Sequence, residues 1–327
     1  MFTTSFTLLL GIVGLVQGHA GHKHVRKRQD APELSELLAG NGRFQAKIQA
    51  ENPTLLSDLT AEGQAPPFMF LGCSDSRVSE GTIFDAAPGT LFTERNIANQ
   101  FSQTDSNSNT VVSYAVAELG VKHIIVMGHY GCGGVAAAIA SPPAAPVDAA
   151  NGAVQSWIAP IRTLFETSTR PEIVTLRESI AGRTDVEEPE PEEPGFRALV
   201  EENIKVSVAA IAATSVIQNH YASLAGLSAE EKRAEGGPPE AVFIHGWVYD
   251  IENGQIQDLN ISVGPPGVAI PPAPFSAVKQ AAEGVEPAAE PAVEATVEPL
   301  QNSADSESPA TICKNKCISK RRLQGSY

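Results

Sequence analysis

Cysteine is scarce in this chain, which has only four among 327 residues. So few cysteines exclude a disulfide-dense scaffold of the kind that stabilises small secreted domains. Two disulfides, in any of three connectivities, remain one interpretation of Cys73, Cys132, Cys313 and Cys317. Cys313 and Cys317 lie in a basic stretch of the C-terminal tail, where a local disulfide or free thiols fit better than metal binding.

Basic residues are also in the minority. Lysine and arginine total 23 against 38 aspartates and glutamates, which gives a formal net charge of −15 at pH 7. This balance argues against nucleic acid as a partner, because phosphate backbones select basic surfaces. Much of the acidity falls between Asp185 and Glu193 and after Glu283, in sequence that we expect to be solvated and flexible. The charge therefore indicates solubility rather than a class of substrate.

Long apolar runs are missing too, so no segment is predicted to span a membrane. The run from Phe6 to Val16 has instead the length of the apolar part of a signal peptide, and small residues follow it. We expect a secretory signal peptide over residues 1–20, and hence a protein that is secreted or resides in the secretory pathway. A dibasic pair ends a short propeptide expected over residues 21–28, and Asn260 begins an N-glycosylation sequon.

The rest of the chain is long enough for a domain with a large buried core. We assign residues 29–263 to this domain. From residue 264 to 327, proline, alanine, glutamate and valine dominate without a period, so this tail is expected to be disordered.

Short apolar runs alternate with helical patterns along the domain. We predict strands over residues 68–71, 90–93 and 123–127, a hairpin of 241–249 with 255–261, and helices over 30–50 (capped by Asp30), 110–119, 133–140, 156–167 and 196–221. Strand, helix and strand in succession imply right-handed crossovers and a parallel sheet.

Candidate metal ligands follow the ends of two predicted strands. Cys73 lies at the end of the first strand, and His129 and Cys132 follow the third. The carboxyl ends of the strands in an open α/β sheet share one edge, where such proteins place their ligand sites. Two cysteines and one histidine suit zinc, and three protein ligands leave one tetrahedral position open. We therefore predict one zinc ion per chain, at a site for hydration or hydrolysis.

Asp75 and Arg77 stand beside the first of these ligands. Two thiolates offset the charge of Zn²⁺ and weaken it as a Lewis acid, so forming hydroxide near neutral pH needs help from the surroundings. Asp75 can accept a hydrogen bond from zinc-bound water or hydroxide, while Arg77 pairs with Asp75 and keeps it ionised. Asp75 can also move onto the zinc as a fourth ligand, which would close the site in a pH-dependent manner.

The region from Leu34 to Ile261 resembles the β-class carbonic anhydrases, in the pattern of their plant-like branch. Four motifs occur in the order of that family: Cys73-Ser-Asp-Ser-Arg77-Val78, Arg95-Asn96-Ile97-Ala98-Asn99, Gly128-His129-x-x-Cys132-Gly-Gly and Gly246-Trp247-Val248-Tyr249-Asp250. The resemblance implies an α/β fold, with a mainly parallel sheet of about four strands, an antiparallel edge strand and flanking helices. It also implies reversible hydration of carbon dioxide to bicarbonate and a proton by zinc-bound hydroxide, with Asp75 and Arg77 as the catalytic dyad.

The same resemblance gives roles to residues outside the zinc ligands. Gln64 matches an amide that hydrogen-bonds substrate or bicarbonate, and Gly133 would offer its N–H to the zinc-bound anion. Phe92 and Tyr114 match aromatic residues that line a narrow apolar cleft, and Arg95 is expected to bond backbone near a subunit interface. Family members build that cleft across the interface, so a homodimer or a larger homo-oligomer is implied.

Other readings fit the same residues. Related zinc enzymes hydrolyse CS₂ or COS, and the ligand set does not distinguish these substrates from carbon dioxide. The Asp75–Arg77 pair together with Gln64 favours carbon dioxide, and a non-catalytic secreted zinc-binding protein would need none of the three. A disulfide between Cys73 and Cys132 would replace the metal site altogether.

Overall fold

The computed structural model describes residues 33–226 and 240–278. The predicted signal peptide (1–20), the propeptide (21–28) and the Asp30 cap lie outside the described residues. The same holds for Cys313, Cys317 and the predicted tail from residue 279 onward.

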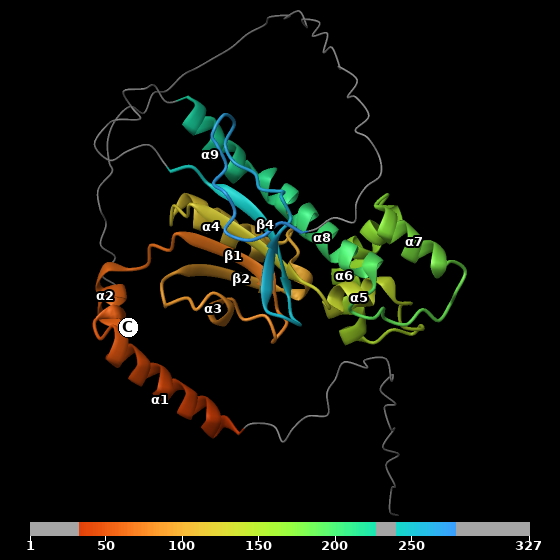
Figure 1. Ribbon diagram of the computed structural model, residues 1–327, viewed down its shortest axis with the longest axis horizontal. Coiled ribbons are helices and arrows are strands. Elements are labelled where there is room, and N and C mark those ends of the chain that lie inside the picture. The colour runs from red at the N-terminus through yellow and green to blue at the C-terminus, as the bar shows by residue number, and fades with distance from the viewer. Residues whose placement is uncertain (1–32, 227–239, 279–327) are drawn as a thin grey trace, which may run out of the picture. The chain divides into compact units, whose positions relative to one another are not determined.

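A five-stranded sheet with the order β2-β1-β3-β4-β5 forms the centre of the fold (Figure 1). Its strands are β1 (Phe68–Cys73), β2 (Leu91–Asn96), β3 (His123–His129), β4 (Phe243–Asp250) and β5 (Gln255–Asp258). Strands β1 to β4 run parallel, whereas β5 pairs antiparallel with β4. The predicted α/β fold, with a parallel sheet and an antiparallel edge strand, is confirmed.

Helices connect the strands and flank the sheet. They are α1 (Leu34–Glu51), α2 (Leu55–Glu62), α3 (Glu80–Ile83), α4 (Ser106–Ala117), α5 (Gly133–Ile139), α6 (Ala149–Thr167), α7 (Pro171–Ser179), α8 (Pro194–Ala212) and α9 (Ser215–Ala225), with a 3₁₀ turn η1 (Ile97–Asn99). Helices α2, α3 and α7 have no counterpart among the predicted elements.

The two faces of the sheet pack against different partners. Met69 and Leu71 of β1 belong to a large apolar cluster that includes side chains of α4, α5, α6 and α8. Phe70, which points to the opposite face, belongs to a smaller cluster with Phe84 and Phe275. Because both faces are covered, the inner strands are apolar along most of their length, as is usual for a parallel sheet.

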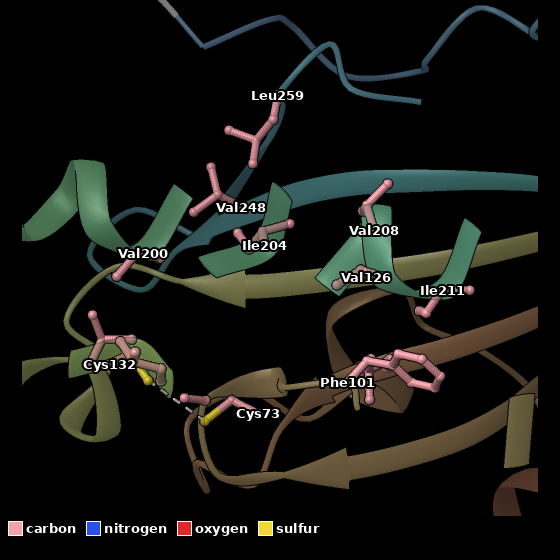
Figure 2. Close-up of a cluster of buried hydrophobic side chains, with 14 of the residues drawn as sticks. Cys73, Phe101, Val126, Cys132, Val200, Ile204, Val208, Ile211, Val248 and Leu259 are labelled. Atoms are coloured by element: carbon pink, nitrogen blue, oxygen red, sulfur yellow. Dashed lines mark hydrogen bonds between the residues drawn. The ribbon is translucent and has the colours of Figure 1, made fainter. Parts of the chain in front are cut away.

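Helix α8 covers the larger cluster. Four of its buried side chains follow one another at helical spacing and lie against the sheet in Figure 2: Val200, Ile204, Val208 and Ile211. Ile204 is fully buried opposite Gly128 of β3 and Gly246 of β4. A Cβ atom on Gly128 would lie 2.8 Å from Ile204 Cδ1, so glycine is required for this close approach. The helix is thereby held next to the strand that ends in His129.

Two predicted helices differ from the observed ones. The helix predicted over residues 196–221 is divided into α8 and α9, because the Thr214 hydroxyl donates to Ile211 O and accepts from the Ile217 N–H. These contacts satisfy backbone groups at the end of one helix and the start of the next. The helix predicted from residue 30 begins at Leu34, with Glu33 in an extended conformation before it.

Two segments expected to be flexible are held in place. In the acidic loop, Val186 and Ser141 exchange hydrogen bonds, and the Glu193 carboxylate accepts from the Phe196 N–H at the start of α8. The tail expected to lack structure from residue 264 keeps contact with the sheet up to Val278, whose N–H donates to Asp258 O. Backbone pairing and helix capping fix these segments despite their polar composition.

Helix α1 buries none of its residues in the described part of the chain. Leu34, Leu37 and Leu38 form an apolar stripe whose members are 83%, 71% and 75% exposed. No described helix has both the length and the apolar content that crossing a bilayer requires.

Candidate metal centre

The Cys–His–Cys group is assembled at one edge of the sheet. Cys73 is the last residue of β1, His129 is the last residue of β3, and Cys132 precedes the first turn of α5. Because β1 and β3 are parallel neighbours, their carboxyl ends meet. The two Sγ atoms and a His129 ring nitrogen lie within 4.8 Å of one another, a spacing from which all three can bind one metal ion. The predicted ligands are therefore brought together.

The donor atoms of this group are buried and fit a metal. His129 is fully buried, and its Nε2 atom has no hydrogen-bond partner among the described residues. The sulfur atoms of Cys73 and Cys132 are 3.9 Å apart and both thiols are free, whereas a disulfide needs about 2.05 Å. A buried ring nitrogen beside two sulfur atoms is a donor set that zinc prefers.

The orientation of His129 is fixed by its neighbour. His129 Nδ1 lies 3.0 Å from the carbonyl oxygen of Tyr130. Because a carbonyl oxygen only accepts hydrogen bonds, Nδ1 carries the proton and Nε2 keeps a lone pair. That lone pair is what a metal ligand requires.

The thiols of Cys73 and Cys132 influence each other. The Cys132 thiol and the His129 ring lower the pKa of Cys73 to about 4, against the effect of burial. Contact with the Cys73 sulfur, together with burial, raises the pKa of Cys132. The contact between the two sulfur atoms thus favours loss of the proton from Cys73 first, and a bound metal ion requires both thiols to be deprotonated.

Asp75 and Arg77 form a planar pair beside the group. Arg77 Nε donates to Asp75 Oδ1 at 2.9 Å and Nη2 donates to Oδ2 at 2.6 Å, while Oδ2 lies 3.7 Å from His129 Nε2. Burial alone would raise the pKa of Asp75, but hydrogen bonds from the Arg77 side chain and N–H lower it to about 2. Arg77 Nη2 also donates to Gly131 O, at 3.1 Å. Both carboxylate oxygens therefore face the guanidinium group.

The loops that carry the site are anchored by backbone contacts. Arg95, at the end of β2, donates from Nε to Cys73 O at 2.9 Å and from Nη2 to Asp75 O at 2.7 Å. It thus bonds backbone, as its motif predicted. On the other loop, Gly131 turns the chain between the two ligands at φ +68°, a conformation that favours glycine.

The four predicted substrate residues are divided between the two ends of the sheet. Gly133 follows Cys132 directly, and a Cβ atom there would meet nothing within 4 Å among the described residues. Gln64 instead precedes β1, and Phe92 pairs with Met69 near the amino end of that strand. Tyr114 stacks on Phe92 with ring centroids 5.8 Å apart. Four residues of strand, about 13 Å, separate Phe92 from the level of Cys73, so one chain does not bring these side chains to the metal group.

The sequence did not reveal the buried residues that contact His129 on the side of Nδ1, away from the metal group. The Tyr130 side chain is 3% exposed, and its hydroxyl donates to Glu201 of α8 at 2.7 Å. Glu201 in turn contacts Arg170, which precedes α7. These residues are far apart in the sequence and follow no motif, so only the packing of α8 on the sheet reveals the connection.

The fold and the site together define a metal-binding α/β enzyme whose reactive edge lies at the carboxyl ends of parallel strands. The sequence profile of the family described as carbonic anhydrase matches residues 68–256, more than half of the chain. A carbonic anhydrase of Emericella nidulans is 32% identical over 233 residues, which cover 71% of this chain and 85% of that protein.

Solved structures agree. The Coccomyxa β-carbonic anhydrase in complex with acetazolamide is 28% identical with a TM-score of 0.55, over 71% of this chain and 88% of its own. One of two tetrameric β-carbonic anhydrases from Sordaria macrospora is 29% identical with a TM-score of 0.54, over 70% and 98%. The chain belongs to the carbonic anhydrase family, and within it to the β class.

Membership of this family establishes the activity and the metal. The chain is a carbonic anhydrase, a zinc lyase that hydrates carbon dioxide. The Cys73, His129 and Cys132 group provides for the zinc ion that β-carbonic anhydrases use.

Proposed function

We propose that Asp75 and Arg77 are the catalytic dyad of this enzyme, at a zinc ion bound by Cys73, His129 and Cys132. The observation that carries the proposal is the bidentate contact between the two side chains, made 3.7 Å from the ligand atom His129 Nε2. A carboxylate held in this way beside a metal position can direct a water molecule bound there.

The proposed chemistry follows from these contacts. When bound, zinc would lower the pKa of a water molecule so that hydroxide is available near neutral pH, with the released proton passing to solvent or buffer. An ionised Asp75 only accepts hydrogen bonds, so it would accept one from the O–H of this hydroxide and turn the lone pair of the hydroxide toward the carbon atom of carbon dioxide. Arg77 fixes the plane of the carboxylate and, through Gly131 O, ties it to the loop between His129 and Cys132. Gly133, the residue after the ligand Cys132, would donate its N–H to the product anion.

Asp75→Asn tests the dyad because it keeps the volume and removes the charge. We expect unchanged zinc content and a loss of carbon dioxide hydration on the order of 10²-fold, the range found when one preorganised hydrogen-bonding group is removed from a transition state. Asp85→Asn is the matched control: Asp85 is exposed, with Lys47 Nζ at 3.8 Å. Stopped-flow hydration and metal analysis on the same samples give both quantities. Wild-type kinetics in Asp75→Asn would refute the dyad.

The same samples test the alternative functions. Turnover of CS₂ or COS without hydration of carbon dioxide would assign the site to the other substrates. Full zinc content with negligible turnover of all three would indicate a binding protein.

We also propose that the enzyme is a homodimer or larger, and that Gln64, Phe92 and Tyr114 of one copy complete the site of another. Two observations support this. Phe92 and Tyr114 stack at the end of the sheet opposite the metal group, with Tyr114 47% exposed. Leu34, Leu37 and Leu38 on α1 are exposed in the part of the chain that the structure describes, and an interface with another copy would bury this apolar surface. The Sordaria macrospora relatives are tetrameric.

A mixed oligomer separates this arrangement from a site built within one chain. Cys73→Ser, which lacks a metal ligand, is co-expressed with Gln64→Ala, which lacks the amide. If Gln64 acts across the interface, the hybrid contains an intact site and regains activity that neither variant shows alone. If the hybrid shows only the sum of the two homo-oligomers, Gln64 acts within its own chain or not at all.

A further inference from the structure

Tyr130, which is not a predicted metal ligand, makes contacts through its hydroxyl, its ring and its backbone. Its hydroxyl donates to Glu201 Oε1 at 2.7 Å, and the guanidinium carbon of Arg197 lies 3.4 Å from the centroid of its ring. Its backbone N–H donates to Tyr249 O at 3.0 Å. Side chain and backbone are therefore fixed together, and with them the carbonyl oxygen that accepts from His129 Nδ1.

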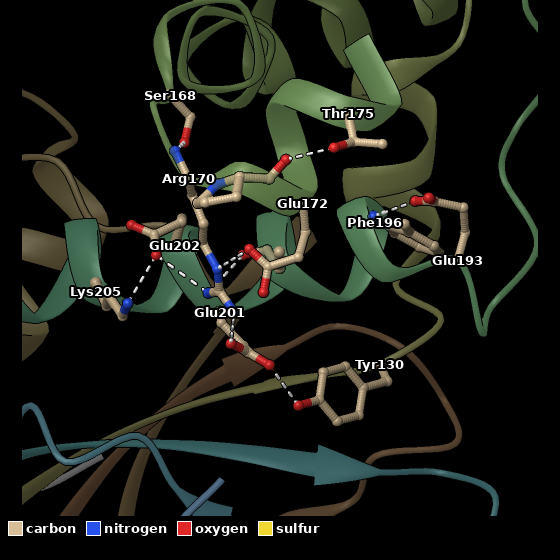
Figure 3. Close-up of polar contacts among 12 residues, drawn as sticks. Tyr130, Ser168, Arg170, Glu172, Thr175, Glu193, Phe196, Glu201, Glu202 and Lys205 are labelled. Carbon is tan, nitrogen blue, oxygen red and sulfur yellow. Dashed lines mark hydrogen bonds and ion pairs between the residues drawn. The ribbon is translucent and has the colours of Figure 1, made fainter. Parts of the chain in front are cut away.

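Glu201 is the buried link between Tyr130 and a cluster of charges on α7 and α8. Figure 3 shows its carboxylate between the Tyr130 hydroxyl and the Arg170 guanidinium, which lies 2.7 Å from Oε2. Arg170 also pairs with Glu172 and Glu202, each at 3.2 Å. Glu201 is only 5% exposed, so its carboxylate depends on the Arg170 guanidinium and the Tyr130 hydroxyl to offset the cost of burying a charge.

The chain of contacts leads to one ligand. Arg170 pairs with Glu201, and Glu201 accepts a hydrogen bond from the Tyr130 hydroxyl. The carbonyl oxygen of Tyr130 in turn accepts a hydrogen bond from His129 Nδ1. The ring nitrogen opposite to a metal-binding one commonly donates to a fixed acceptor, which sets the tautomer and the angle of the ring. Here that acceptor is a backbone oxygen, and the side chain of the same residue connects it to Glu201 and Arg197 of α8.

We propose that Arg170, Glu201 and Tyr130 are positioning residues that hold His129 in its metal-binding orientation. The inference rests on the metal site of the proposed function and concerns how tightly that site keeps its metal. Loss of the Tyr130 hydroxyl removes one of the contacts that fix the residue, so its carbonyl oxygen is held less tightly against His129 Nδ1 and the metal is released faster.

Tyr130→Phe tests the proposal, with Tyr221→Phe as the matched control. Tyr221 is also buried, at 7% exposure, and its hydroxyl donates to Val242 O at 3.0 Å, away from the metal group. We expect Tyr130→Phe to release zinc to a chromophoric chelator on the order of 10-fold faster than wild type, as for other residues behind a ligand. The absorption bands of the Co²⁺-substituted protein should shift as well, while Tyr221→Phe shows neither change.

A second pair of variants covers the case in which Tyr130→Phe does not fold. Glu201→Gln keeps an acceptor for Tyr130 but removes the charge that Arg170 holds, and should speed metal release at least twofold. Glu172→Gln alters another partner of Arg170 that makes no contact with Tyr130 in the chain of contacts described above. This control variant should release the metal at the wild-type rate. Normal release and an unshifted Co²⁺ spectrum in Tyr130→Phe or Glu201→Gln, whatever their thermal stability, would overturn the proposal.

Failure of the metal site itself gives a different result. In that case wild type and Cys73→Ser would bind the same amount of zinc. The release assay requires no turnover, so its outcome is independent of the dyad.

Discussion

Replacing Arg77 with lysine separates two effects of the guanidinium on Asp75. Arginine fixes the plane of the carboxylate through two parallel hydrogen bonds and also keeps it ionised. Lysine retains the positive charge but offers a single nitrogen, which cannot contact both oxygens and also reach Gly131 O. The variant thus loses orientation and keeps most of the electrostatic attraction.

The size of the loss follows from the contacts removed. A hydrogen bond to a charged group contributes about 1.5–3 kcal/mol, and the half-exposed position of Arg77 puts it at or below the lower end, about 1–1.5 kcal/mol. If that energy orients the attacking water in the transition state, kcat/KM falls about 10-fold. Lysine keeps a positive charge beside Asp75, and this charge continues to favour the ionised carboxylate against the effect of burial on its pKa. The loss is therefore expected to be independent of pH between 6 and 9.

Stopped-flow hydration across this pH range, with zinc content checked on each sample, measures the effect. A variant as fast as wild type would show that the bidentate geometry is not needed. A deficit that disappears as the pH rises would show that Arg77 acts on ionisation rather than on orientation. Either result would refute the reasoning.

Three further predictions concern stability and maturation. Ile204→Ala should lower the free energy of unfolding by about 3 kcal/mol in denaturant titration because it leaves a cavity, whereas Val206→Ala on the exposed side of α8 should change it by less than about 0.5 kcal/mol. Burial lowers the pKa of His245 to about 4, so as the pH falls below 6.5 the unfolded chain takes up a proton before the folded one and stability is lost. Between pH 7 and pH 5 the free energy of unfolding of His245→Gln should therefore fall by about 2 kcal/mol less than that of wild type. Equal falls in the two proteins, measured by denaturant titration at each pH, would contradict this. Protein from a secreting host should begin at Gln29 and carry a glycan on the exposed Asn260, which mass spectrometry detects before and after enzymatic deglycosylation; an unmodified chain beginning at Met1 would contradict the leader.

Local patterns were enough to predict the sheet and the ligands. Apolar runs identified β1 and β3, and Cys73 and His129 end these strands, so adjacency in the sequence placed them at one edge. The division of the helix predicted over 196–221 was not visible because the residues around Thr214 permit a helix, and only its hydroxyl contacts show the break. Composition also misled at the acidic loop, where backbone pairing with Ser141 outweighs the charge of the segment.

Contacts between distant segments could not be predicted. Tyr130 and Glu201 are 71 residues apart, and their hydrogen bond depends on how α8 lies across the sheet. Gln64 precedes β1 and Phe92 lies in β2, but the motifs alone do not say that one chain keeps these residues away from Cys73.

The ligands come from two strands that pair only in the folded sheet, and this couples metal binding to folding. An unfolded chain separates Cys73 from His129 and Cys132, so zinc binds the native state more tightly than the unfolded one and stabilises it by mass action. At a free zinc concentration 1,000 times the dissociation constant, this linkage contributes about 4.1 kcal/mol. The zinc concentration thus acts on this protein as a folding variable, in the same sense as temperature or denaturant. Two variants have comparable stabilities only when they are measured at equal metal occupancy.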